Sequence, residues 1–140
     1  MRINPYLSFK GQCREAFEFY AKTFRGEIAM IMSQGESPIA AELPAASRDL
    51  IMHAQLHVGD QVLMGADAPE NAEGCGPSQG NGCVTITVDS VDEAERLFAA
   101  LSAGGTVFMP IAETFWAQRF GMASDRFGTP WMINCLKPMS

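Results

Sequence analysis

Long hydrophobic runs and clusters of basic residues are both missing from this chain of 140 residues. A membrane-spanning helix needs about 20 consecutive apolar residues, and no run comes near that length. The first residues, MRINPYLSF, lack the apolar stretch of a signal peptide. The ten basic residues are scattered singly in a chain of net charge −6, so no cationic stripe is available for phosphates. We therefore expect a cytoplasmic protein that binds neither membranes nor nucleic acid.

Metal-binding and disulfide patterns are also scarce. The cysteines stand far apart, form no CxxC pair and occur at positions Cys13, Cys75, Cys83 and Cys135. This spacing matches neither a zinc finger nor a disulfide framework. We expect free thiols in a reducing compartment.

The order of predicted elements repeats along the chain. In the first half, a strand over 4–9 and a helix over 12–24 precede a strand over 27–33 and a hairpin with its turn at 58–60. In the second half, a strand over 83–88 and a helix capped at 89–90 precede a strand over 107–110 and a hairpin with its turn at 125–128. Gly26 and Gly104 are expected to end the two helices, where the chain needs a positive φ.

Two modules explain this repetition. The helical stretches EAFEFYAKTFRGEI and EAERLFAALSAGGTV match at a spacing of 78 residues, and the hairpins HVGDQVLM and RFGTPWMI match at 69. We predict one domain, with module one at about 1–67, a linker at about 68–82 and module two at about 83–140. The segment SQGESPIAAELPAASRD reads as a loop or flap. The glycine-rich GCGPSQGNG precedes a strand rather than a helix, which is not the setting of a dinucleotide loop.

Three stretches carry a family resemblance. They are NPYLSFKGQCREAFEFYAKTF, HAQLHVGDQVLMGAD and ETFWAQRFGMASDRFGTPWMIN, and they occur in this order. With the repeat, they make nearly the whole chain resemble the PhnB-like branch of the glyoxalase/bleomycin-resistance/dioxygenase (vicinal oxygen chelate) superfamily. The resemblance implies an α+β fold of two repeated βαβββ modules that form half-barrel sheets around a cavity, in a homodimer. It also implies that Phe115 and Trp116 lie on or beside the strand that closes the second half-barrel.

The resemblance raises the question of a metal site. Metal-using relatives place one ligand on the first strand and one on a later strand of each module. Carried over to this sequence, those positions are Pro5 or Tyr6, His53 or Gln55, Cys83 and Met132. Proline and methionine cannot replace hard ligands, so the metal site is expected to be lost or incomplete. We predict no metal or other cofactor, and leave open zinc held by the His53 strand and Cys83.

The strand around His53 offers the best candidate polar wall. His53, Gln55 and His57 occupy alternate positions, so they share one face of a strand. They line a cavity, or they lie on a solvated outer face. His57 stands beside the turn and is expected to be exposed, which makes His53 the better ligand contact or general base. A slip of one residue would turn in Ala54 and Leu56 instead.

The C-terminal stretch offers a second candidate wall. Glu113, Arg119 and Asp125 accompany the aromatic pair Phe115 and Trp116, and such a set could fix a small ligand. The alternative is structural: Phe115 and Phe120 belong to the core, Arg119 and Asp125 pair with each other or with solvent, and Trp116 covers a barrel end.

These observations predict a cavity that binds a small molecule and is lined by Tyr6, His53, Gln55, Phe115 and Trp116. The favoured function is a small-molecule-binding protein of this superfamily without an intact metal site. The first alternative is a metal-dependent lyase, isomerase or dioxygenase that acts on a substrate with vicinal oxygens. The second is a dimer whose surface is the functional part. No Rossmann βαβ unit is evident, which counts against the methyltransferase label attached to this branch.

Overall fold

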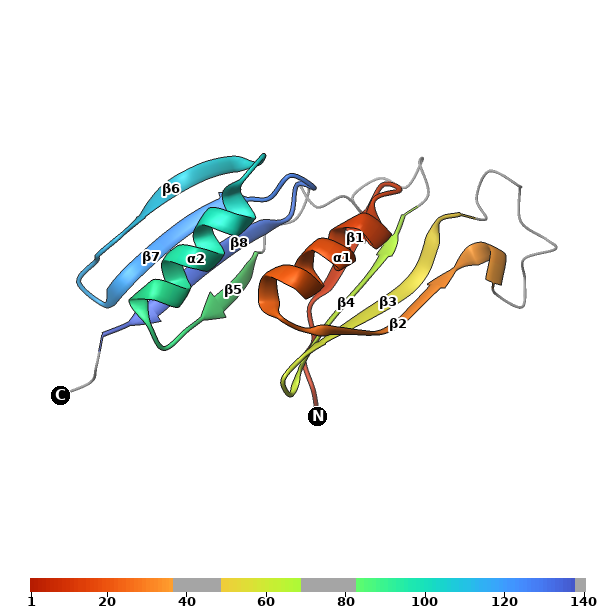
Figure 1. Cartoon of the computed structure of the whole chain (residues 1–140), viewed down its shortest axis with the longest axis horizontal. Coiled ribbons are helices and arrows are strands. Elements are labelled where there is room, and N and C mark those ends of the chain that lie inside the picture. The colour runs from red at the N-terminus through yellow and green to blue at the C-terminus, as the bar shows by residue number, and fades with distance from the viewer. Residues whose placement is uncertain (37–48, 69–82, 138–140) are drawn as a thin grey trace. The chain divides into compact units, whose positions relative to one another are not determined.

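The computed structural model describes residues 1–36, 49–68 and 83–137. The chain divides into two compact units, Met1–Gln79 and Gly80–Ser140, and in each unit one helix crosses one four-stranded sheet (Figure 1). The predicted α+β fold of two repeated modules is therefore confirmed. Most of the predicted flap and linker, together with Cys75, lies outside the described residues. No helix in the described ranges is long and apolar enough to cross a membrane.

The first unit has a parallel strand pair at one edge of its sheet. Strand β1 runs parallel to β4, and β4, β3 and β2 follow one another antiparallel, in the sheet order β1-β4-β3-β2. The elements of this unit are β1 (Tyr6–Phe9), α1 (Cys13–Phe24), β2 (Glu27–Ser33), the short 3-10 helix η1 (Gln34–Glu36), β3 (Ile51–Val58) and β4 (Gln61–Asp67).

The second unit has the same topology. Its sheet has the order β5-β8-β7-β6, again with the first pair parallel and the others antiparallel. The side chain of Ser90 caps the helix by accepting a hydrogen bond from the backbone N–H of Glu93, as predicted. The elements are β5 (Val84–Thr87), α2 (Val91–Ser102), β6 (Thr106–Ala112), β7 (Ala117–Ser124) and β8 (Pro130–Leu136).

Each helix packs on one face of its own sheet. A Cβ atom at Gly65 of β4 would come within 2.8 Å of the ring of Phe17, and one at Gly121 of β7 within 2.7 Å of the ring of Phe98. These two glycines therefore mark the helix-covered faces. Because side chains alternate along a strand, the neighbours of each glycine point the other way. We call the surface on that side the distal face of the sheet.

Aromatic and aliphatic side chains fill the space between each helix and its sheet. In the first unit, Phe9 and Phe17 are almost fully buried and their rings meet edge to face, 6.2 Å apart. In the second unit, Leu101 and Ile133 are equally buried, and so is Trp131. The two tryptophans of the chain thus have different environments, because Trp116 is 41% exposed and Trp131 only 2%.

The prediction for Gly26 needs a correction. The residue with positive φ at the end of α1 is Arg25, at φ 56, whereas Gly104 does have a positive φ after α2. Gly26 serves a different purpose: a Cβ atom there would lie 2.6 Å from the carbonyl oxygen of His57. Glycine is required at this position because β2 leaves the helix directly against β3. The second unit has one additional residue here, so Gly105 makes the corresponding close approach.

Replacing Gly26 with alanine is expected to lower the free energy of unfolding by about 2 kcal/mol, because the new methyl group would push against backbone atoms that cannot move alone. Gly59→Ala is the matched control. Gly59 has a positive φ but nothing within 4 Å of an added Cβ, so this substitution should lower the free energy of unfolding by only about 1 kcal/mol. Urea unfolding measures both, and equal losses would show that the contact at Gly26 relaxes freely.

The spacing of 69 residues between the hairpins holds for the turns and fails for the strands that follow. Gly59 and Gly128 both have positive φ, as the alignment predicts. However, Val58 pairs with Gln61 across a two-residue turn, whereas five residues separate the ends of β7 and β8. Leu63 is buried against its helix, while Met132 lies on the distal face, so residues 69 apart point to opposite faces beyond the turn.

Candidate functional site

Three of the predicted site residues meet on the distal face of the first sheet. The hydroxyl oxygen Oη of Tyr6 lies 3.3 Å from Nδ1 of His53, and Nε2 of His53 lies 3.1 Å from the amide Nε2 of Gln55. The Tyr6 and His53 rings are tilted against each other with centroids 5.8 Å apart. Both ring nitrogens of His53 therefore have hydrogen-bond partners, one on β1 and one on its own strand.

Methionines border this polar group. The strand register places Met64 of β4 between Tyr6 and Gln55, and Met30 of β2 on the other side of Gln55. Met30 is 38% exposed, and Tyr6 is 50% exposed. We call Tyr6, His53, Gln55, Met30 and Met64 together the row. It combines a reachable hydroxyl with flexible apolar side chains that adapt to irregular shapes.

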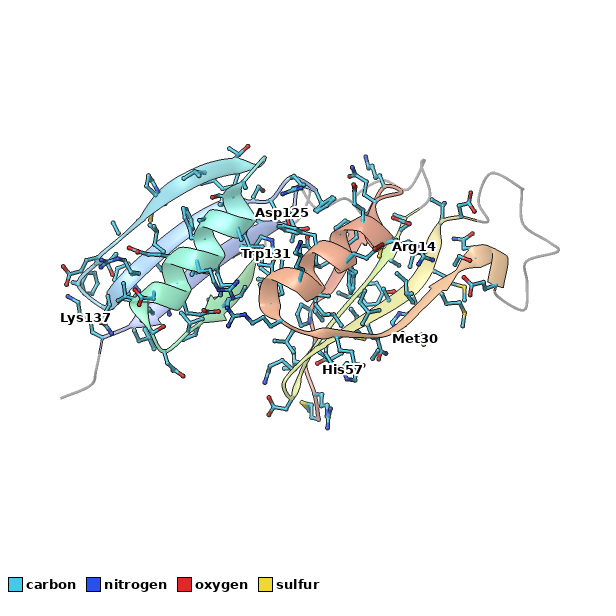
Figure 2. All side chains as sticks on the ribbon, in the orientation of Figure 1. Arg14, Met30, His57, Asp125, Trp131 and Lys137 are labelled. Atoms are coloured by element: carbon cyan, nitrogen blue, oxygen red, sulfur yellow. The ribbon has the colours of Figure 1, made fainter. Side chains whose placement is uncertain are left out.

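The register of β3 agrees with the prediction. Ala54 and Leu56 are fully buried on the helix-covered face, so His53 and Gln55 point to the distal face. His57 is exposed, as predicted (Figure 2). Only Ile51 departs from simple alternation, because a bulge at Met52 returns it to the buried face.

The pKa values of Tyr6 and Cys13 are both raised. Burial, and after it the neighbouring thiol of Cys13, raises the pKa of Tyr6, so its hydroxyl stays protonated at neutral pH. Burial, followed by the carboxylate of Asp67, raises the pKa of Cys13 to about 12, and Arg14 opposes this rise. Cys13 is therefore a neutral thiol at neutral pH, which is unsuited to nucleophilic catalysis or metal binding.

The aromatic pair of the second unit is exposed and held in place. Phe115 is 88% exposed, and its ring meets Trp116 edge to face at 4.7 Å. Trp116 in turn meets Phe120 at 5.3 Å. Hydrogen bonds between Thr114 and Ala117 fix the turn that carries the pair. Of the structural alternatives, core burial holds for Phe120 and is wrong for Phe115.

The charged residues near this pair have partners of their own. Glu113 forms an ion pair with Lys137 at 3.1 Å, and Arg119 forms one with Glu95 of α2, also at 3.1 Å. Arg119 and Asp125 therefore do not pair with each other, because Arg119 bonds to Glu95 and Asp125 to groups of its own hairpin. A ligand site that combines Glu113, Arg119 and Asp125 gains no support either, because each is engaged elsewhere.

Asp125 has a structural role that the sequence signalled only in part. Its Oδ1 accepts hydrogen bonds from the backbone N–H groups of Phe127 and Thr129, and its Oδ2 accepts one from Nε1 of Trp131 at 2.8 Å (Figure 2). An Asp followed by Gly within a turn is the usual sign of the first two bonds. The tryptophan bond depends on the fold. Trp131 therefore anchors the hairpin rather than a ligand.

Asp67 has a similar role in the first unit. Its Oδ1 accepts hydrogen bonds from the backbone N–H groups of Gly11 and Cys13, and its Oδ2 accepts one from Ile51. This carboxylate, at the end of β4, caps α1, because Gln12 at the helix start provides no side-chain cap. No local sequence signal reveals it, since Gly11 and Cys13 lie 56 and 54 residues away.

A pocket with a volume of about 340 Å³ lies at the start of α1, on the helix-covered side of the sheet. None of the five predicted ligand residues lines it. Its walls carry Arg14 and several acidic groups, and the Asp67 oxygens there are already bonded to the backbone. The lining residues are Gly11, Arg14, Glu15, Glu18, Asp49, Ile51 and Asp67.

The positions that could hold a metal are only partly equipped to do so. His53 and Gln55 lie together, Cys83 is exposed at the start of the second unit, and Met132 contacts the hydroxyl of Thr85 at 3.6 Å. Within the described ranges, no group of three or more His, Cys, Asp and Glu side chains has a geometry that could hold an ion. Cys13, Cys83 and Cys135 are free thiols.

A family model described as 3-demethylubiquinone-9 3-methyltransferase matches residues 1–134. The chain belongs to this family. Protein YjdN of Escherichia coli (strain K12) is 36% identical and is aligned over 98% of this chain and 97% of its own length. The crystal structure of protein PA1353 from Pseudomonas aeruginosa is 46% identical, with a TM-score of 0.85 and 99% coverage of each chain.

More distant solved structures share the fold of this chain. A PhnB protein from Bacillus cereus is 24% identical with a TM-score of 0.79, covering 96% of this chain and 99% of its own. A glyoxylase/bleomycin resistance protein/dioxygenase domain from Frankia sp. EAN1pec is 11% identical with a TM-score of 0.65, and 98% of each chain is covered. At these identities the likeness concerns the fold. It confirms the predicted glyoxalase-like fold.

Proposed function

We propose that this PhnB-like chain binds an apolar small molecule and does so without an intact metal site. The observation that carries the proposal is the hydrogen-bonded group of Tyr6, His53 and Gln55, which combines a half-exposed hydroxyl with a border of methionines. Ligand sites are mostly apolar and contain a few well-placed polar groups, and this row has that composition.

The second unit supports the same proposal with Phe115 and Trp116. A phenylalanine that is 88% exposed, on a turn fixed by hydrogen bonds, presents a large apolar area to its surroundings at little cost in conformational entropy. We propose that this pair stacks on an aromatic or hydrophobic ligand.

A metal-dependent enzyme that acts on vicinal oxygens is the second candidate. His53 and Gln55 favour it, because they occupy a ligand position of metal-using relatives and point to the same face. Both nitrogens of His53 already have hydrogen-bond partners, so a metal would have to displace Tyr6 or Gln55. This rearrangement makes the metal-free binding protein the better proposal.

The methyl transfer in the family's description is not what we propose. Each sheet contains a single parallel strand pair, β1 with β4 and β5 with β8, and the other pairs are antiparallel. A doubly wound parallel sheet with a cofactor crevice, the usual frame for a nucleotide cofactor, is not formed by the described residues.

We also propose that the chain forms a homodimer in the cytoplasm. Val107, Phe108 and Met109 of β6 are 46%, 60% and 44% exposed, and this uncharged run supplies apolar surface suited to association. The free thiols of Cys13, Cys83 and Cys135 suit a reducing compartment.

A screen of aromatic compounds tests the proposed function. A compound that binds should raise the melting temperature and quench the fluorescence of Trp116, and Trp116→Phe should remove the quenching. At a free concentration of 100 times Kd, the ligand should stabilise the protein by about 2.7 kcal/mol. For a compound that binds to the first unit, His53→Ala should weaken binding about tenfold, because it removes the partner of the Tyr6 hydroxyl.

His57→Ala is the matched control, since it removes an exposed histidine from the same strand and should leave the affinity unchanged. Protein purified without chelator and challenged with zinc, nickel, manganese and iron separates the two candidates. Stoichiometric metal that disappears in His53→Ala would favour the metalloenzyme and contradict the proposal.

A further inference from the structure

We propose that the hydroxyl of Tyr6 is an outward hydrogen-bond donor, so that the ligand of this distal face carries a hydrogen-bond acceptor. The inference rests on the proposed binding function and adds the chemical class of the ligand. It follows from the direction in which hydrogen bonds run along the row, beginning at Met64.

The thioether of Met64 sets the orientation of the Gln55 amide. The amide Nε2 lies 3.9 Å from Sδ of Met64 and 3.1 Å from Nε2 of His53. An amide NH₂ group has two donor hydrogens, and a thioether sulfur can only accept. Turning the amide over would place its oxygen against the sulfur and remove this contact. Met64 therefore keeps the nitrogen of Gln55 directed at the histidine.

The orientation of Gln55 then selects the tautomer of His53. Since the amide nitrogen donates, the Nε2 atom of His53 must accept. A neutral imidazole has one N–H group and one acceptor nitrogen, so the proton resides on Nδ1. That Nδ1–H group points at the Tyr6 oxygen 3.3 Å away and donates to it.

Tyr6 therefore accepts from His53 and directs its own proton elsewhere. The residue is 50% exposed, so an incoming molecule can reach the hydroxyl. Burial of part of the ring, together with Cys13, raises the pKa of Tyr6, so the hydroxyl keeps its proton. Its complement is a carbonyl oxygen or an aromatic ring nitrogen on an apolar body that lies against Met64, the neighbour of Tyr6 in the sheet.

Nitrogen-15 NMR of the two histidine rings tests the direction of the hydrogen bonds along the row and needs no ligand. In mildly alkaline buffer, His53 should be mainly the Nδ1–H tautomer, whereas the exposed His57 should show the Nε2–H form favoured by histidine side chains in water. Met64→Leu keeps the side-chain volume and removes the acceptor, so it should reduce the excess of the Nδ1–H form about fivefold. Gln55→Glu should move the proton to Nε2. A wild-type His53 protonated on Nε2 would overturn the proposal.

Two bicyclic probes of similar size test the ligand class. Quinoline offers a ring nitrogen that accepts, and indole offers an N–H group that donates. In NMR titrations, quinoline should bind about tenfold more tightly than indole, and Tyr6→Phe should abolish that difference. Indole binding as tightly as quinoline would overturn the ligand class. If neither probe binds while His53 has the expected tautomer, the proposed binding function is wrong, and the inferred direction of the hydrogen bonds along the row is still supported.

Discussion

Asp67→Ala is expected to lower the free energy of unfolding of the first unit by about 3–5 kcal/mol. The substitution leaves the backbone N–H groups of Gly11, Cys13 and Ile51 without the carboxylate that accepts their hydrogen bonds. The Cys13 and Ile51 bonds are buried, so water cannot replace the lost acceptor without local opening. Both the start of α1 and the start of β3 should loosen.

Hydrogen exchange gives the decisive measurement, because it reports each amide separately. Protection should fall at Cys13 and Ile51 in Asp67→Ala, and amides of the second unit should be unaffected. Asp60→Ala is the control, since that carboxylate is exposed at the β3–β4 turn and should change stability by less than about 0.5 kcal/mol. Unchanged protection at Cys13 would refute a capping role for Asp67.

Asp125→Ala should have a comparable effect on the second unit, about 3–5 kcal/mol. Three buried donors lose their acceptor: the N–H groups of Phe127 and Thr129, and the indole N–H of Trp131. The indole should become more accessible to water, so the fluorescence of Trp131 should shift to longer wavelength. Urea unfolding followed by this signal gives the loss of stability.

A double-mutant cycle with Trp131→Phe separates the indole bond from the two turn bonds. If the carboxylate and indole act as a pair, the two substitutions together should cost clearly less than the sum of their separate effects. Asp89→Ala, at an exposed aspartate before α2, is the control and should be nearly neutral. Additive losses in the cycle would mean that Asp125 acts on the turn alone.

The residues around His53 show why parts of the fold and site could be predicted. Alternation along β3 is a local property, and it was enough to assign His53 and Gln55 to one face and Ala54 and Leu56 to the other. Tyr6 was brought into the set only by family resemblance. The structure adds the hydrogen bond that joins it to His53 across 47 residues of sequence. Whether these residues bind a ligand stays a prediction.

Other features depend on contacts that a sequence does not display. The need for glycine at position 26 comes from the His57 carbonyl on another strand, so a helix-end rule explained the residue by the wrong cause. The hairpin spacing of 69 came from matched turn glycines, and the different loop lengths then shifted the strands by one position. Such a shift exchanges the two faces of a strand, and pattern matching alone does not detect it.

Strand β6 has a consequence for how the protein behaves when it is concentrated or partly unfolded. It is an edge strand, and its exposed run Val107–Phe108–Met109 contains no charge to repel another strand. Bare edges of this kind are templates for aggregation by strand addition between molecules. Pro110 follows directly and has no N–H group to donate, so it interrupts the ladder that a second chain could form. The ring of Pro110 thus limits strand addition at this apolar edge of the second sheet.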